Sequence, residues 1–278
     1  SETLPTFRSR VRLPSLAPWA IFAKILRLFN QKKIEHFLKK NLGISESYLL
    51  KRRAKRYLNN NTEKELSLLP DLVDRKKASI DIGVYRGVYS YFLSDLTEYV
   101  YSFEANNLLQ NKLISAFKNK KNVKIENLAL SSSSGTVELR VPIRDENADY
   151  NDEEKYELGI ATIHSENNLH NKNYETVKNI KKISLDEYNF LHEIGFIKID
   201  VEGHELEIIR GGKNFLKHHK PVMLIEIEER HTGKRPVDII DEICSHGYNC
   251  FIINEKLKLI ELSDLSKISN NNFIFKPK

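Results

Sequence analysis

Short apolar runs alternate with amphipathic stretches along most of the chain. Runs rich in β-branched and aromatic residues predict buried strands, and apolar residues spaced by three or four predict helices. The expected strands are 78–82, 99–103, 123–130, 136–141, 196–200, 221–227, 248–253 and 272–275, and the expected helices are 88–96, 107–117, one starting at Gly203, and 236–246. Strands that alternate with helices form βαβ units, so we predict an α/β fold with a mostly parallel sheet and helices on both faces.

The N-terminal quarter has a different pattern. Apolar residues recur there at helical spacing, namely Trp19, Phe22, Ile25, Leu26 and Phe29, and a second helix-like stretch follows at 34–42. The polar run 59–62 separates this part from the alternating pattern. We therefore predict a helical N-terminal extension over residues 1–70 and a main domain over residues 71–278.

Positive charge is concentrated in this extension. The chain has 44 Lys and Arg against 38 Asp and Glu, but residues 1–70 hold 15 against 5, so the extension carries +10 and the rest −4. Its most basic run is 51–56. One interpretation of this basic, amphipathic sequence is a helical extension that packs its apolar stripe on the main domain. The alternative is that residues 1–58 contact an anionic membrane surface or another polyanion. Stacking aromatics are sparse there, which argues against nucleic acid.

Cysteine usage and hydropathy indicate the compartment. The two cysteines, Cys244 and Cys250, lack a metal-like spacing with histidines, and the longest uncharged apolar stretch near the N-terminus, 16–23, is far below the roughly 20 residues that cross a bilayer. No small-residue cleavage site follows an apolar run. We therefore expect a cytoplasmic protein, with the inner face of a membrane as the alternative.

An acid and two glycines follow the first predicted strand, at Asp81, Gly83 and Gly87. Glycine lets the backbone turn tightly and approach a ligand, and the N–H groups at a helix start are exposed. Tyr85 stands where the NAD fingerprint needs glycine, and Asp81 would repel a pyrophosphate. A carboxylate would suit the ammonium group of a bound amino acid instead. A plain strand-to-helix turn is the structural alternative.

A second acid, Glu104, ends the next strand about 20 residues later, where it could accept hydrogen bonds from both hydroxyls of a ribose. Asn127, at the end of the third strand, is a candidate for pairing with the amino edge of adenine, and a turn-forming Asn is the alternative. An ammonium group and a ribose without phosphate match S-adenosylmethionine. Two consecutive strands that end in acids fit a ligand across the carboxyl ends of a parallel sheet.

Three acids and a histidine lie within six residues after strand 196–200: Asp200, Glu202, His204 and Glu205. We expect Asp200 to orient or deprotonate the acceptor and Glu202 to assist it, with helix N-capping as the structural alternative. His231 is the second candidate for the base, because a neutral imidazole accepts protons near neutral pH.

Three further residues are candidate acceptor contacts: His164, His204 and Glu226. The acidic stretch 145–157 is expected to form a flap that suits neutral hydroxylated acceptors better than polyanions. Asp200, Glu202 and Glu226 could together hold a magnesium ion, but nothing in their spacing requires it, so no metal is predicted.

These motifs, in this order, resemble the FkbM family of S-adenosylmethionine-dependent methyltransferases. The resemblance covers roughly residues 78–245 and includes Asp81, Gly83, Gly87, the runs 102–104, 127–130 and 184–186, Gly135, the run 198–205, Gly211 and the stretch from Lys220 to Glu226. It departs from the family at Val84 and Tyr85, where Ala-Asn is common, and at His204, where a small residue is usual.

The resemblance implies a class I methyltransferase (Rossmann-like) fold, with a seven-stranded sheet whose last strand is antiparallel. It also implies S-adenosylmethionine as cofactor and O-methylation of a hydroxyl on a sugar or polyketide-like product. We therefore expect an O-methyltransferase that acts on a saccharide or glycolipid. The alternatives are a nucleic-acid methyltransferase that uses the basic extension, and a catalytically idle binding or scaffold protein.

Overall fold

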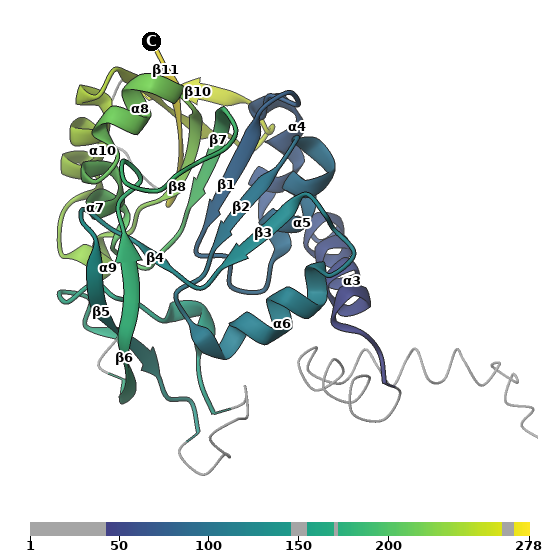
Figure 1. Ribbon diagram of the computed structural model, residues 1–278. Helices are drawn as coiled ribbons and strands as arrows, with labels where there is room; N and C mark the ends of the chain where they lie inside the picture. Colours follow the sequence, from purple (N-terminus) through teal and green to yellow (C-terminus); the bar gives the residue numbers. More distant parts are fainter. Residues whose placement is uncertain (1–42, 146–154, 170–171, 263–269) are drawn as a thin grey trace, which may run out of the picture. The chain divides into compact units, whose positions relative to one another are not determined.

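The computed structural model describes residues 43–145, 155–169, 172–262 and 270–278 (Figure 1). The expected helical stretches at 19–29 and 34–42, and most of the acidic stretch 145–157, lie outside the described residues. The compact unit that contains the sheets spans Glu46–Lys278, so it includes residues 46–70, which the sequence pattern assigned to the extension. No helix in the described ranges is long and apolar enough to cross a membrane.

An eight-stranded sheet forms the centre of this unit, in the order β10-β9-β11-β8-β7-β1-β2-β3. Its strands are β1 (Ala78–Ile82), β2 (Val100–Phe103), β3 (Val123–Glu126), β7 (Ile194–Ile199), β8 (Val222–Glu226), β9 (Tyr248–Ile253), β10 (Leu259–Glu261) and β11 (Asn272–Pro277). Neighbours from β3 to β8 pair in parallel, and β11 is antiparallel to both β8 and β9. This confirms the expected α/β sheet with its antiparallel last strand, and β10 adds an eighth strand at the edge.

A second, three-stranded sheet has the order β4-β6-β5, from β4 (Ala129–Leu130), β5 (Gly135–Pro142) and β6 (Tyr174–Ile183). The run 123–130, predicted as one strand, is two strands in two sheets, because the chain leaves the main sheet after Glu126. The predicted strand 136–141 is present as β5. The sequence analysis missed β6, because Ile180 is its single buried residue and it therefore shows no apolar run.

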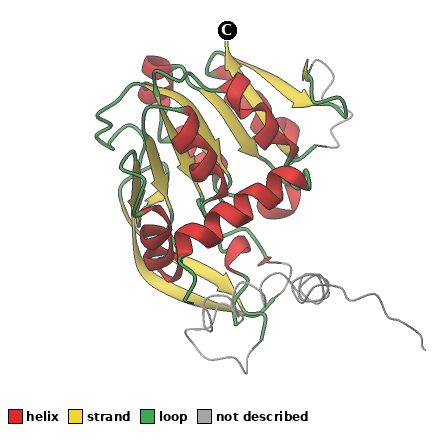
Figure 2. Cartoon of the chain, turned by 90° about the vertical axis from the view of Figure 1, so that its right-hand side faces the viewer, coloured by secondary structure: helices red, strands yellow, loops and turns green. Residues whose placement is uncertain are grey.

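Helices cover both faces of the main sheet. The helices α4 (Leu69–Leu72) and α5 (Val88–Leu96) pack into one apolar cluster with the sheet, and α7 (Glu205–Arg210), α8 (Lys213–His219) and α10 (Pro236–Ser245) pack into another. The helix expected from Gly203 to the glycines at 211 and 212 is present as α7, and the sequence analysis missed α8, which follows them. The helix α6 (Asn107–Phe117) lies near the second sheet, whose long strands run along one end of this unit (Figure 2).

The basic run 51–56 lies on α3 (Glu46–Asn59), which contacts α5 and α6. Leu49, Leu50 and Ala54 are buried in this contact, so the packing alternative holds for this helix. Arg53 is a buried member of the basic run. It is 8% exposed and donates a hydrogen bond to the carbonyl oxygen of Arg86 at 3.1 Å. The expected membrane contact of residues 1–58 stays a prediction.

Candidate active site

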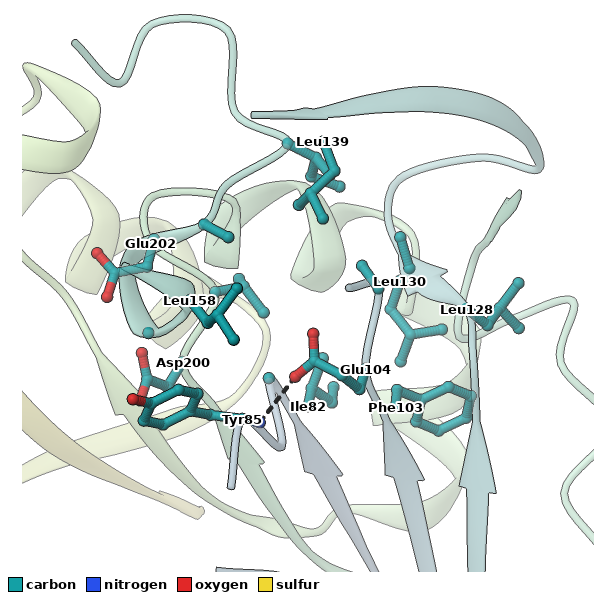
Figure 3. Close-up of a pocket in the computed structure, with 17 residues that line it drawn as sticks. Ile82, Tyr85, Phe103, Glu104, Leu128, Leu130, Leu139, Leu158, Asp200 and Glu202 are labelled. Atoms are coloured by element: carbon teal, nitrogen blue, oxygen red, sulfur yellow. Dashed lines mark hydrogen bonds between the residues drawn. The ribbon is translucent and has the colours of Figure 1, made fainter. Parts of the chain in front are cut away.

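A cleft lies at the carboxyl ends of β1, β2 and β7, where parallel strands of such sheets commonly present their ligands (Figure 3). It encloses about 660 Å³, part of it open to solvent, and the second sheet and the short 3₁₀ helix η2 (Leu158–Ile160) form its other wall. Three acids reach it: Glu104, Asp200 and Glu202. The rest of the lining is mostly apolar, including Phe103, Leu128 and Leu130.

Gly83 brings the turn after β1 against the end of β7. Its φ is +81°, and a Cβ added there would lie 1.7 Å from the backbone oxygen of Asp200. Gly87 also has φ +81°, but a Cβ there would meet the ring of Phe117 at 2.8 Å, outside the cleft. Gly83 therefore shapes the cleft directly, whereas Gly87 allows the start of α5 to pack on α6.

Glu104 points into the cleft from the end of β2 (Figure 3). Its Oε2 accepts a hydrogen bond from the backbone N–H of Tyr85 at 2.7 Å, and its Oε1 accepts one from the N–H of Asn106 at 2.8 Å. Burial raises the pKa of Glu104 to about 7, against the opposing effect of these two N–H groups. The carboxyl group is thus fixed in orientation and keeps lone pairs for a hydroxylated ligand.

Glu104→Gln is expected to weaken binding of S-adenosylmethionine by about 1–3 kcal/mol, because an amide accepts fewer hydrogen bonds than a carboxylate. Hydroxyl donors favour the ionised form, so wild-type affinity should rise from about pH 6 to about pH 8 as Glu104 loses its proton, and the variant should lack this rise. Isothermal titration at both pH values measures this. Glu126→Gln, outside the cleft, is the control. A pH dependence retained in Glu104→Gln would contradict the assignment.

Asp81 lies inside β1 and does not line the cleft. It is 1% exposed, its Oδ2 accepts a hydrogen bond from Ser90 Oγ at 2.6 Å, and its Oδ1 is buried without a partner among the described residues. Burial raises the pKa of Asp81, while the charge of Lys198 opposes the rise. Its contact with the ammonium group of a bound amino acid stays a prediction.

Asn127 is exposed at the turn that follows β3. Its Nδ2 donates hydrogen bonds to the carbonyl oxygens of Glu104 and Ala105, at 2.9 and 3.3 Å. These bonds hold the loop after β2, as the turn-forming alternative expects, and Asn127 lies outside the cleft lining. The pairing with adenine stays a prediction.

Asp200 follows β7 and lines the cleft with a side chain that is 30% exposed. Its Oδ2 lies 2.7 Å from Nζ of Lys198, a buried residue whose ammonium group is also 4.9 Å from the ring centroid of Tyr89. Burial opposes the charged form of Lys198, but Asp200 and Asp81 raise its pKa above the usual value. Sequence reasoning missed Lys198. The pattern that could have indicated it is a lysine two residues before Asp200 on an apolar strand, because residues two apart point to the same face of a strand.

Glu226, at the end of β8, lies behind Asp200 and outside the cleft lining. Burial and the negative charge of Asp200 raise the pKa of Glu226 to about 9, and the two carboxyl groups share a hydrogen bond. The raised pKa favours the protonated form of Glu226, which can donate a hydrogen bond to Asp200. Together with Lys198 it fixes the orientation of Asp200; the predicted contact of Glu226 with the acceptor stays untested.

His231 lies on α9 (Glu229–Thr232), is 5% exposed and is outside the cleft lining. Its Nε2 is 3.0 Å from Oε2 of Glu202 and 3.6 Å from Oε2 of Glu228. Burial favours the neutral ring, but these two carboxylates raise the pKa of His231 overall. His231 thus holds Glu202, and the cleft presents the carboxylate rather than the imidazole.

The backbone of Glu202 is held from the second wall of the cleft. Its φ is +57°, and its carbonyl oxygen accepts hydrogen bonds from Thr162 Oγ1 and Asn167 Nδ2, both at 2.8 Å. Sequence reasoning missed Thr162 and Asn167, because isolated polar residues in a long connection carry no distinctive pattern. Their hydrogen bonds attach the connection between β5 and β6 to the loop that follows β7.

His164 and His204 lie next to each other, with ring centroids 5.9 Å apart, and neither is in the cleft lining. Nε2 of His204 lies 3.0 Å from Ser131 Oγ. Burial lowers the pKa of His204 to about 4 and also lowers that of His164, so both rings are neutral at pH 7. Their contact with the acceptor stays a prediction. Within the described ranges, no group of three or more His, Cys, Asp and Glu residues is arranged to hold a metal ion.

A sequence model of the methyltransferase FkbM domain matches residues 81–250, more than half of the chain. The chain belongs to the FkbM methyltransferase family. This family uses S-adenosylmethionine, which is therefore the cofactor of the domain. No curated protein is significantly similar to the chain in sequence.

Solved methyltransferase structures are similar at low sequence identity. A methyltransferase FkbM from Methylobacillus flagellatus KT is 13% identical with a TM-score of 0.45, over 73% of this chain and 44% of that one. An rRNA methylase from Streptococcus thermophilus is 10% identical with a TM-score of 0.40, over 78% and 95%. A TehB-like SAM-dependent methyltransferase from Corynebacterium glutamicum is 12% identical with a TM-score of 0.39, over 83% and 99%. The chain spans less than half of the length of the FkbM structure.

The cleft of this FkbM domain fits the chemistry of the cofactor. Glu104 offers a fixed carboxylate for ribose hydroxyls, and the apolar side chains of Phe103, Leu128 and Leu130 suit an adenine ring. Negative charge at Asp200 and Glu202 suits the cationic sulfonium and ammonium groups. Gly83 lets the turn approach Asp200 closely because it has no Cβ, and Tyr85 of the same turn lines the cleft.

Proposed function

We propose that the chain transfers the methyl group of S-adenosylmethionine to a hydroxyl group of a saccharide or glycolipid acceptor. The observation that carries the proposal is the fixed Asp200 carboxylate at the open end of a strand, beside a cleft that fits the methyl donor. A carboxylate in this position accepts the hydrogen bond of a hydroxyl nucleophile.

The cofactor supplies an activated methyl group, so the protein must align the acceptor and take up its proton. Glu104 would hold the ribose, and Asp200 would accept the hydrogen bond of the acceptor hydroxyl. Because Lys198 and Glu226 both hold Asp200, its oxygens keep one direction, and such alignment contributes several kcal/mol to rate. Glu202 is the second carboxylate at the cleft and would assist Asp200, and His231 holds it in place.

The acids at the cleft also favour a neutral acceptor over a polyanion. Glu104, Asp200 and Glu202 would repel the phosphates of a nucleic-acid strand, which proteins usually bind with Lys and Arg. A hydroxyl of a sugar carries no charge and can donate to a carboxylate. We therefore favour a saccharide acceptor over the nucleic-acid alternative.

Loss of the chain from its cells is expected to remove one methyl ether from a cellular glycan or glycolipid. Mass spectrometry of glycans from cells with and without the gene measures this as the loss of one methylene mass. Complementation with the wild-type chain should restore the modification, and complementation with Asp200→Asn should not. Identical glycans in both strains, with a methyl group missing from RNA or protein instead, would contradict the acceptor class.

A further inference from the structure

A basic hollow lies at the edge of the main sheet opposite the cleft. The cleft is where β1, β2 and β7 end, whereas this hollow is where β8 and β9 begin. The residues that line the hollow come from α8, the start of β9 and the C-terminal end, and Figure 1 shows α8 and the C-terminus at the same end of the unit. The hollow encloses about 920 Å³, part of it open to solvent. Its lining includes Lys213, Lys217, Lys220, His246, Tyr248 and Lys278.

Among the described residues, the lysines of the hollow have no acidic partner. Lys213, Lys217 and Lys220 are spaced by four and three residues, which places them on one face of α8 and its cap. All three are exposed, none forms an ion pair within the described part of the chain, and no Asp or Glu lines the hollow. Ammonium groups that surround one hollow repel each other, so an anion bound there would relieve the repulsion.

Helix capping explains only part of this arrangement. Lys217 lies in the last turn of α8 and Lys220 is its cap, where cations are stabilised by the helix dipole. Lys213 begins the helix, where the same dipole disfavours a cation. The third lysine on this face therefore has no explanation in the stability of the helix.

Tyr248 gives an independent observation at the same place. Tyr248 is 1% exposed and belongs to the lining of the hollow, and its hydroxyl is buried without a hydrogen-bond partner among the described residues. Proteins rarely leave a buried hydroxyl unpaired, because the lost hydrogen bonds to water are not replaced. A phenol donates readily to an anionic oxygen.

We propose that this hollow binds a phosphoryl group, with the ammonium groups of Lys213, Lys217 and Lys220 and the hydroxyl of Tyr248 as donors. A phosphoryl group offers several anionic oxygens to donors that converge from different directions. The site is separate from the methyl-transfer cleft, so it does not depend on the proposed function.

Isothermal titration of the full chain with inorganic pyrophosphate at low ionic strength tests the proposal. We expect saturable binding that weakens at least about tenfold in the double variant Lys217→Glu/Lys220→Glu and about fivefold in Tyr248→Phe. Lys118→Glu/Lys121→Glu, on exposed residues after α6, makes the same charge change elsewhere and should leave the affinity nearly unchanged.

Tyr248→Phe also has a stability readout. Because it removes an unpaired buried hydroxyl, the unliganded variant should melt about 2–4 °C higher than the wild type while binding pyrophosphate more weakly. The proposal would be overturned if Tyr248→Phe left the affinity for pyrophosphate unchanged, or if the two double variants lowered it equally. Either result would mean that the net positive charge of the surface attracts pyrophosphate without a specific site.

Sedimentation with vesicles separates the two sources of the phosphoryl group. Phosphatidylcholine vesicles with and without phosphatidic acid are compared for the Lys217/Lys220 and the Lys118/Lys121 double variants. Loss of binding to phosphatidic acid in the first variant alone assigns a lipid headgroup. Equal vesicle binding, together with the expected pyrophosphate titrations, assigns a soluble phosphate compound.

Discussion

Gly83→Ala is expected to lower the free energy of unfolding by about 2–5 kcal/mol and to abolish binding of S-adenosylmethionine. A left-handed conformation at a non-glycine residue costs about 1–2 kcal/mol, and a forced overlap of packed atoms adds about 1–3 kcal/mol. The added Cβ would lie 1.7 Å from the backbone oxygen of Asp200, so the turn and the end of β7 must separate. Urea unfolding and isothermal titration measure the two effects.

Gly233→Ala is the matched control for this variant. Gly233 has φ +65°, but a Cβ there has nothing within 4 Å, so it has a similar backbone penalty without the overlap. The control should lose about 1–2 kcal/mol and retain cofactor binding. Equal destabilisation of the two variants, with binding retained in both, would show that Gly83 serves the backbone turn alone.

Asp200→Asn is expected to lower kcat about 10²- to 10⁴-fold at saturating S-adenosylmethionine. An amide cannot take a proton, and it replaces the carboxylate that pairs with the buried Lys198. Glu226→Gln is the matched control, because its amide still donates a hydrogen bond toward Asp200 and should keep most of the activity. Methyl-transfer kinetics with saturating cofactor, after a folding check on each variant, measure this.

The pH dependence of the same variants separates the two candidate bases. Glu202 and Glu228 raise the pKa of His231. If His231 were the base, activity would therefore rise with pH through a pKa above the ordinary histidine range. We expect His231→Gln to retain the wild-type pH profile with lower kcat, since its effect passes through Glu202. A limb that disappears in His231→Gln, together with substantial activity in Asp200→Asn, would make the histidine the base.

The sequence was most informative where buried residues form a regular apolar pattern along the chain. The strand at 78–82 and the helices at 88–96 and 107–117 were predicted with the bounds that the structure shows, because apolar runs and their spacing define such elements. The acids at the strand ends were also predicted to meet, and Glu104 and Asp200 do line one cleft. A parallel sheet collects the carboxyl ends of its strands at one edge, so this part follows from topology.

Features that depend on tertiary contacts could not be predicted. The strand β6 is largely exposed and became a strand by pairing with β5, which no apolar pattern records. The roles of Lys198 and Glu226 depend on which groups surround Asp200 in three dimensions. The burial of Asp81 inside β1, outside the cleft lining, could not be predicted from the residues either, and its contact with the cofactor stays a prediction.

Transfer of a labelled methyl group tests the central claim most directly. The purified chain is incubated with S-adenosylmethionine that carries an isotopic label in its methyl group, together with a cell extract separated into saccharide, glycolipid, nucleic-acid and protein fractions. We expect the label to enter the saccharide or glycolipid fraction as a methyl ether, and Asp200→Asn to abolish the incorporation. Label in nucleic acid or protein, or no binding of S-adenosylmethionine by the folded chain, would contradict the claim.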